Sequence, residues 1–221
     1  SGDPVVTPTL DMVLGCYYMT SMRPGTKGEG KLFGSFDEAK LAYDLGVIDL
    51  KAEIEVRDQN NEGKRVKTCV GRIIFNDAFP KEIGFRNTTF DKSNIKKIVA
   101  DCAKILTDED MADVMDRIKD MGFKFATKSG TTIAMSDIEV PKSKPKMIAE
   151  AEEKTILIDS QYENGLITED ERYDEVVRVW METTDKVTEA TQKSLDPLSG
   201  IYMMATSGAK GNMTQIRQMA G

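Results

Sequence analysis

Residues 146–190, KMIAEAEEKTILIDSQYENGLITEDERYDEVVRVWMETTDKVTEA, decide the fold of this chain. The first half of the stretch places apolar or small residues at steps of three and four, at Ile148, Ala151, Thr155, Ile158 and Tyr162. The second half repeats this spacing at Tyr173, Val176, Trp180, Thr183, Val187 and Ala190. Such heptad spacing is typical of helices that pack along a common seam. The stretch therefore predicts two helices in a coiled coil, with Trp180 on the inner face.

The residues between the two seams predict a short connection. Asn164 and Gly165 favour the end of the first helix, because both residue types tolerate the left-handed backbone that follows a helix C-terminus. Thr168 and Glu171 have the spacing of a capping box, which starts a second helix. Two matching helices joined by so few residues form an antiparallel hairpin.

The tip of this predicted hairpin is strongly acidic. Residues 150–175 contain ten acidic side chains against two basic ones, Lys154 and Arg172. A cluster of like charges is usually a solvated surface. A rigid tip that also carries Leu166 and Ile167 could instead bind a partner. The residue pattern alone favours the solvated surface.

Residues ahead of the hairpin show strand patterns. Residues 50–57 alternate apolar and charged side chains, which is typical of a strand with one solvated face. Residues 66–75 are expected to pair with this strand after a turn at 60–63. The apolar, aromatic segment 13–19 is predicted to be another strand, and residues 123–133 are predicted to be extended.

Three helices are also predicted in this region. Ser35 and Glu38 have capping-box spacing, and Gly46 marks the end of that helix. Residues 93–106 and 108–121 have the apolar spacing of two short helices.

The proline-rich segment PKSKP at residues 141–145 marks a change of pattern. We expect a domain boundary there. The sequence thus predicts an α+β fold, in which a mixed α/β domain at residues 1–141 precedes the hairpin and the C-terminal segment at residues 142–221.

Composition narrows the function classes. The 221 residues are 40% hydrophobic and carry a formal net charge of −7, which argues against strong DNA binding by the chain alone. The sequence has no histidine, and so lacks the commonest general base near neutral pH. Cys16, Cys69 and Cys102 are far apart and lack metal-site spacing, so they are expected to be reduced and buried. No apolar run or signal segment indicates a membrane, and a cytoplasmic location is expected.

One glycine-rich motif imitates a nucleotide site. Residues 25–31, GTKGEGK, have the spacing of a phosphate-binding loop. Leu32 follows, where such a loop needs a hydroxyl for Mg²⁺, and the next helix cap is only at Ser35. We expect a surface loop, and an NTP-hydrolysing enzyme is the least favoured hypothesis.

The C-terminal residues 201–221, IYMMATSGAKGNMTQIRQMAG, contain no acidic side chain, and their only charges are Lys210 and Arg217. Glycines that expose backbone N–H groups, together with basic side chains, suit close approach to phosphate oxygens. On spacing alone, a flexible basic tail is the simpler interpretation.

This segment resembles the one that leads into the bridge helix of the largest (beta-prime) subunit of bacterial DNA-directed RNA polymerase, where the usual pattern is SGARGN followed by QIRQLAG. Four further stretches resemble the same family, in the same order along the chain. They are DPVVTPTLDMVLGCYY at 3–18, TCVGRIIF at 68–75, GFKFATKSGTTI at 122–133 and GLITEDERY at 165–173.

The resemblance implies a role for each part. Residues 1–141 would be the pore domain, which walls the secondary channel for nucleoside triphosphates, and residues 142–200 the rim helices, or funnel. Lys210, Gln215 and Arg217 would line the path of the triphosphates and the RNA 3′ end. Transcript-cleavage factors of the Gre type would dock at the hairpin tip, on Asn164, Leu166, Ile167, Thr168, Glu169, Asp170 and Glu171.

The same resemblance places the chemistry elsewhere. The aspartates that hold the catalytic Mg²⁺ in this family lie upstream of the matched region, so no catalytic residue, metal site or cofactor is expected in these 221 residues. Nucleotidyl transfer would be an activity of the whole multisubunit polymerase, and the 221 residues alone are expected to be inactive. The alternative from a different class is a stand-alone coiled-coil adaptor.

Two departures from the family pattern bear on the sites. Lys210 stands where arginine is usual, which keeps the charge but loses the planar bidentate fork. Asp174 and Glu175 stand where proteobacterial subunits tend to carry Asn-Lys, so a regulator that needs that lysine is not expected to bind.

Overall fold

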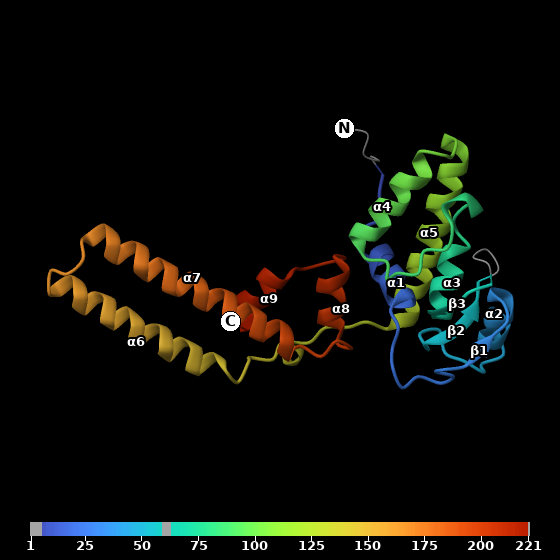
Figure 1. The fold of residues 1–221 in the computed structure, drawn as a ribbon. Coiled ribbons are helices and arrows are strands. Elements are labelled where there is room, and N and C mark those ends of the chain that lie inside the picture. Colours follow the sequence, from blue (N-terminus) through green and yellow to red (C-terminus); the bar gives the residue numbers. More distant parts are fainter. Residues whose placement is uncertain (1–5, 59–62, 221) are drawn as a thin grey trace. The chain divides into compact units, whose positions relative to one another are not determined.

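The computed structural model describes residues 6–58 and 63–220. The chain divides into two compact units, one made of residues up to 131 together with 203–210, and the other of 132–202 together with the residues from 211 (Figure 1). Helices predominate and a single small sheet is present among the described residues, which confirms the predicted α+β fold.

The sheet of the first unit has the order β1–β2–β3. β1 (Leu32–Phe33) pairs in parallel with β2 (Ile54–Arg57), and β2 pairs antiparallel with β3 (Arg65–Thr68). The predicted β2–β3 pairing is confirmed, although the turn expected at 60–63 falls mostly outside the described residues. The second strand is shorter than predicted, because the chain turns at Cys69 into the helix α3 (Val70–Asn76). A short apolar run fits a buried helix as well as a strand.

The predicted strand at 13–19 is wrong, because these residues belong to the helix α1 (Asp11–Thr20). α1 is buried on most sides, so its sequence shows no amphipathic period that would distinguish a helix from a strand. Its buried residues are Val13, Leu14, Gly15, Cys16, Met19 and Thr20.

The predicted extended segment after residue 122 is also wrong as far as Ser129, because α5 (Asp108–Ser129) continues through it. Gly122 does not end the helix but allows α1 to approach closely. A methyl group added at Gly15 would lie 1.8 Å from the carbonyl oxygen of Gly122. Gly130, with φ 56°, is the residue that ends α5.

The remaining helices of this unit begin at polar caps. Ser35 precedes α2 (Phe36–Asp44), and its side chain accepts a hydrogen bond from the Glu38 N–H. The Glu38 carboxylate accepts from the Gly34 N–H at 2.6 Å, so the predicted capping box forms only in part. Asp91 caps α4 (Lys92–Ala103), and Thr107 caps α5 through the Asp110 N–H. A 3₁₀ turn, Lys81–Ile83, lies between α3 and α4.

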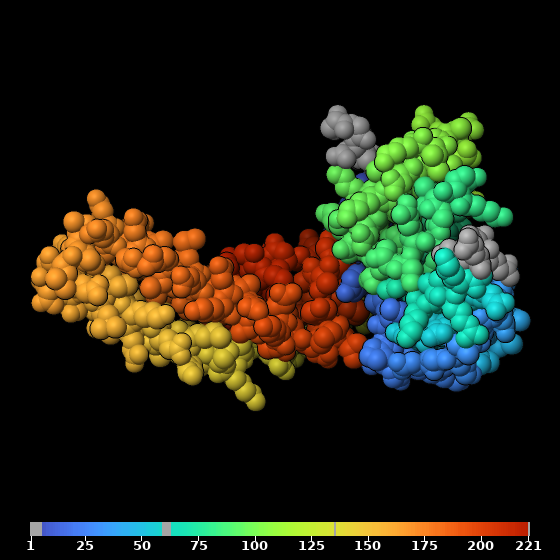
Figure 2. Space-filling view, in the orientation of Figure 1, coloured from blue at the N-terminus to red at the C-terminus, as the bar shows by residue number. Residues whose placement is uncertain are grey.

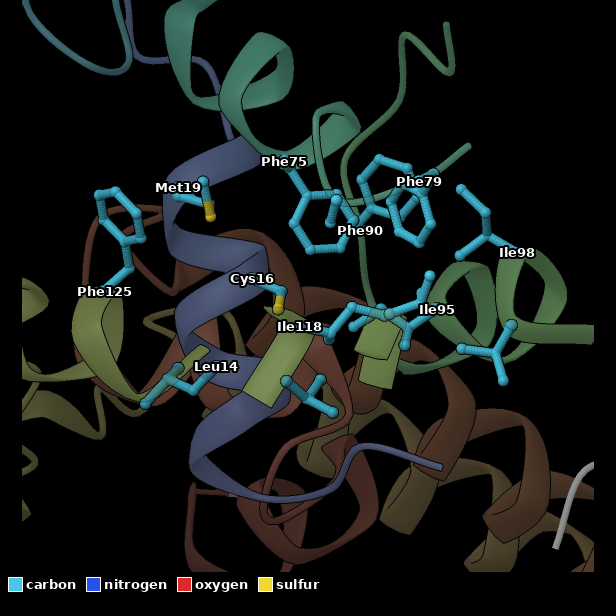
Figure 3. Packing of buried hydrophobic residues seen from close by; sticks show 14 of the residues in the cluster. Leu14, Cys16, Met19, Phe75, Phe79, Phe90, Ile95, Ile98, Ile118 and Phe125 are labelled. Atoms are coloured by element: carbon cyan, nitrogen blue, oxygen red, sulfur yellow. The ribbon is translucent and has the colours of Figure 1, made fainter. Parts of the chain in front are cut away.

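A phenylalanine cluster lies in the main core, against α1, α4 and α5 (Figure 3). The ring centroids of Phe75 and Phe90 are 4.4 Å apart, and those of Phe75 and Phe79 are 5.2 Å apart. The three cysteines are buried and free, as expected. Burial raises the pKa of the Cys16 thiol to about 12, which keeps it protonated near neutral pH.

The buried Arg72 ties the end of α1 to the loop that precedes α4. Its Nε donates to the carbonyl oxygen of Thr20 at 2.9 Å, and its terminal nitrogens donate to Asn87 Oδ1 and Thr89 Oγ1. A guanidinium at a helix C-terminus also interacts favourably with the helix dipole.

The second unit contains the predicted hairpin. A short 3₁₀ turn, Met135–Asp137, precedes α6 (Lys144–Glu163), which lies beside α7 (Glu169–Ser194), with the connection at one end (Figure 1). On α6 the predicted seam is confirmed at Ala151, which is buried, and at Ile148, Thr155 and Ile158, which are partly buried. The prediction is wrong at Tyr162, which is 41% exposed.

The seam of α7 differs from the prediction at two positions. Tyr173 is 64% exposed and Trp180 is 38% exposed, so neither is an inner residue. Val179 is more buried than Trp180, and the inner face continues through Thr183 and Val187. The seam follows the 3.6-residue period of a straight helix, which drifts from a strict heptad.

The C-terminal segment forms two helices, α8 (Gly200–Ser207) and α9 (Met213–Ala220), and is not the structureless tail that the spacing favoured. Gly208 and Gly211, with φ of 72° and 77°, lie between them. α9 packs against α7. No helix in the described ranges is long and apolar enough to cross a membrane.

Candidate functional site

The hairpin tip has a well-defined backbone. The N–H groups of Gly165 and Leu166 donate to the carbonyl oxygens of Tyr162 and Gln161, both at 2.9 Å. This is the Schellman pattern that closes a helix C-terminus, and the φ of 69° at Gly165 permits it. Asn164 adds a side-chain bond from Nδ2 to the Ser160 carbonyl oxygen at 2.7 Å. The sequence signal at Asn164-Gly165 is therefore confirmed as a helix end.

The start of α7 forms the predicted capping box. The Thr168 N–H donates to Glu171 Oε2 at 2.8 Å, and the Glu171 N–H donates to Thr168 Oγ1 at 3.3 Å. The hydrogen bonds from the Thr168 backbone and side chain lower the pKa of the Glu171 carboxyl group. Thr168 and Glu171 therefore hold the turn in shape.

Glu169 belongs to an ion-pair cluster across the tip. Its two carboxylate oxygens accept hydrogen bonds from Arg172 at 2.6 and 3.2 Å. Arg172 also donates to Asp159 of α6 at 3.0 Å, and its guanidinium lies 5.4 Å from the ring centroid of Tyr162. The Arg172 hydrogen bond lowers the pKa of Glu169. These contacts fasten α7 to α6 at the tip.

Two of the predicted tip residues remain available for a partner. Leu166 is 73% exposed. Asp170 is exposed and makes no hydrogen bond or ion pair with the residues that the structure describes. Ile167 is half-buried. The sequence pattern does not distinguish the three tip acids. In the structure Glu169 and Glu171 stabilise the tip, whereas Asp170 does not.

The three residues expected to line the triphosphate path have different surroundings. Lys210 belongs to the first unit and is exposed beside a cavity of about 240 Å³ that Leu10, Asp11, Leu14, Met204 and Ala209 also line. Gln215 belongs to the second unit and caps α9, because its Oε1 accepts from the Asn212 N–H while its own N–H donates to Asn212 Oδ1. Arg217 extends from α9 towards Thr188 of α7, at 3.5 Å.

The glycine-rich loop at 25–31 leads into β1 and not into a helix, which is the surface loop that we expected. The Gly25 N–H donates to the Glu29 carboxylate and the Gly30 N–H to the Glu53 carbonyl oxygen. Two of the backbone donors are therefore already paired. Within the described residues, no group of three or more His, Cys, Asp or Glu side chains could hold a metal ion.

Sequence reasoning missed a groove at the base of the hairpin. Trp180 and Arg217 line two cavities together, of about 450 and 280 Å³. The sequence signal for this groove is indirect, because the seam spacing predicts an inner position for Trp180 and the resemblance places Arg217 on the triphosphate path.

Comparison with known proteins identifies the family of the chain. A family model described as RNA polymerase Rpb1, domain 3 matches residues 1–138, and one described as domain 4 matches residues 167–221. The chain belongs to the RNA polymerase Rpb1 family.

The relatives are beta-prime subunits of bacterial RNA polymerase. Over 221 residues the chain is 58% identical to DNA-directed RNA polymerase subunit beta' of Dehalococcoides mccartyi, which covers 100% of this chain and 17% of that protein. It is 50% identical to the subunit of Desulforamulus reducens over 220 residues, covering 100% of this chain and 18% of that protein. The chain thus spans less than a fifth of the length of these two relatives.

Proposed function

We propose that this chain is an architectural section of a bacterial RNA polymerase, which acts in transcription without carrying the catalytic centre. Residues 1–141 would form part of the wall of the secondary channel, and residues 142–200 the rim at its mouth. The support is the whole-length similarity to beta-prime subunits together with the family resemblance of the five motifs. This similarity favours a polymerase section over a stand-alone coiled-coil adaptor.

The observation that carries the docking role is the construction of the hairpin tip. A Schellman motif, a capping box and the Arg172 cluster make the tip rigid, so binding a partner costs little ordering entropy. Leu166 offers an apolar contact, and Asp170 offers a carboxylate that the described chain does not neutralise. In this proposal a Gre-type cleavage factor presents a basic surface to Asp170, and the attraction mainly raises the association rate.

The triphosphate role rests on the C-terminal segment. Lys210 is exposed, so its ammonium group can steer phosphates through the channel of the intact enzyme. Gln215 and Arg217 remain part of this proposal as lining residues, although both already have contacts within the second unit. Nucleotidyl transfer, and the Mg²⁺ that it uses, would belong to the intact enzyme and to residues outside this chain.

The proposal is tested by the binding of a Gre-type factor to the 221-residue chain at low salt. Asp170→Lys should slow association at least fivefold, because Asp170 is the one carboxylate among residues 164–171 that has no partner within the described chain. Glu182→Lys is the matched control, since this exposed acid lies 12 residues further along α7, about 18 Å from the tip. An unchanged association rate for Asp170→Lys would remove the tip from the docking site.

A further inference from the structure

The base of the hairpin carries a groove that the proposed docking role does not use, and Arg217 is the one proposed channel residue that lines it. Its two cavities share Trp180 and Arg217, and every lining residue belongs to the second unit. α9 crosses α7 at this groove, and Figure 2 shows the red atoms of the C-terminal residues beside the orange atoms of α7.

The smaller cavity combines apolar walls with positive charge. Ile148, Trp180 and Val187 supply apolar surface, and Arg217 supplies a cation. Lys144 also lines the cavity, but its ammonium group already donates to the Ala220 carbonyl oxygen at 3.4 Å. Among the described residues, no acidic side chain lines the smaller cavity, and Asp185 is the one acid that lines the larger cavity. Among the described residues, Arg217 contacts the neutral Thr188 hydroxyl and has no carboxylate within ion-pair distance. The cavity therefore favours an apolar group that carries a negative charge.

Exposed apolar side chains continue the groove along the same flank of α7. Tyr173, Val177 and Met181 follow each other at steps of four, and Met181 is 65% exposed. Exposed apolar side chains that lie together beside a groove mark interaction sites more often than single ones do. The rest of the hairpin is acidic, so the positive charge of Arg217 distinguishes the groove from its surroundings.

We infer that the groove binds a polypeptide segment that pairs an apolar side chain with a neighbouring carboxylate. The volume of about 280 Å³ lies at the lower limit of ligand pockets, roughly 300–1,000 Å³, so the cavity takes one anchoring side chain and not a whole helix. The apolar side chain packs on the Trp180 ring, and the carboxylate pairs with Arg217. Burying such an anchor beside a paired charge follows the usual pattern of binding hot spots.

The single tryptophan of the chain allows a direct test. The probe is the blocked pentapeptide glycine-leucine-glutamate-leucine-glycine, titrated into the 221-residue chain while Trp180 emission is followed. A saturable blue shift is expected, because the partly exposed indole becomes covered. The peptide with lysine in place of glutamate should bind at least fivefold more weakly.

Two variants distinguish the effect of the Arg217 charge from a general effect on the fold. Arg217→Gln should abolish the preference for the acidic peptide, whereas Arg178→Gln should retain it, because Arg178 pairs with Glu175 and lines neither cavity. Equal binding of both peptides, no effect of either peptide, or a dimer in sedimentation that covers Trp180 would overturn the inference.

Discussion

The crossing of α1 and α5 allows a quantitative prediction for Gly15→Ala. The added methyl group would lie 1.8 Å from the backbone carbonyl oxygen of Gly122 and 2.8 Å from the Ala126 nitrogen. Backbone atoms of a helix cannot rotate away as a flexible side chain does, so the two helices must separate. Overpacking a core typically costs about 1–3 kcal/mol, and a clash with backbone belongs at the upper end of that range. Replacing glycine by alanine stabilises a helix by about 1 kcal/mol, which offsets part of this cost.

The expected net destabilisation is therefore about 2 kcal/mol, or roughly a thirtyfold rise in the opening equilibrium of the first unit. Amide hydrogen exchange in α1 and α5 measures this rise locally. Trp180 lies in the second unit, so its emission during urea unfolding should not shift. Gly34→Ala is the matched control, because its methyl group would meet only the end of the flexible Glu38 side chain, at 3.2 Å, and no backbone atom. Exchange rates in α1 within threefold of the parent protein would refute the packing argument.

Three further outcomes are expected. Thr168→Ala removes the capping box of α7 and should lower the unfolding free energy of the hairpin by about 1 kcal/mol, read from Trp180 emission; an unchanged urea midpoint would contradict this. Hydrogen bonds lower the pKa values of Glu169 and Glu171 below the ordinary 4.5. The two carboxylates therefore stabilise the hairpin fully above pH 4.5, and this stabilisation is lost as the pH falls through the lowered pKa values. Glu171→Gln should make the hairpin melting temperature less dependent on pH between 2.5 and 5. Burial raises the pKa of Cys16 to about 12 and that of Cys102 to about 11, so iodoacetamide at pH 8 should label these thiols only after unfolding, as measured by mass spectrometry.

The hairpin could be predicted because its signals are local. The Asn164-Gly165 stop and the Thr168 capping box each depend on a few neighbouring residues, and the structure forms both. α1 could not be assigned, because a helix buried on most sides has no polar face to reveal its period. Gly122 had the appearance of a helix stop, since its role depends on Gly15, more than a hundred residues earlier in the chain.

The candidate site shows the same limit. The sequence identified the acidic tip but could not say that Glu169 pairs with Arg172 or that Glu171 is used by the cap, because both depend on side-chain geometry. The groove escaped notice for a similar reason. A drift of the α7 seam turns Trp180 partly outwards, and only the packing of α9 brings Arg217 beside it.

The different contacts of Asp170 and Glu171 have a genetic consequence. A single base change that replaces Asp170 would leave the hairpin tip folded but would weaken its attraction for a basic surface. Loss of the Glu171 side chain would instead break the capping box, while the Asp170 charge would remain. In the proposed docking role, the first change would mainly slow the association of a factor, and the second would loosen the surface to which the factor binds.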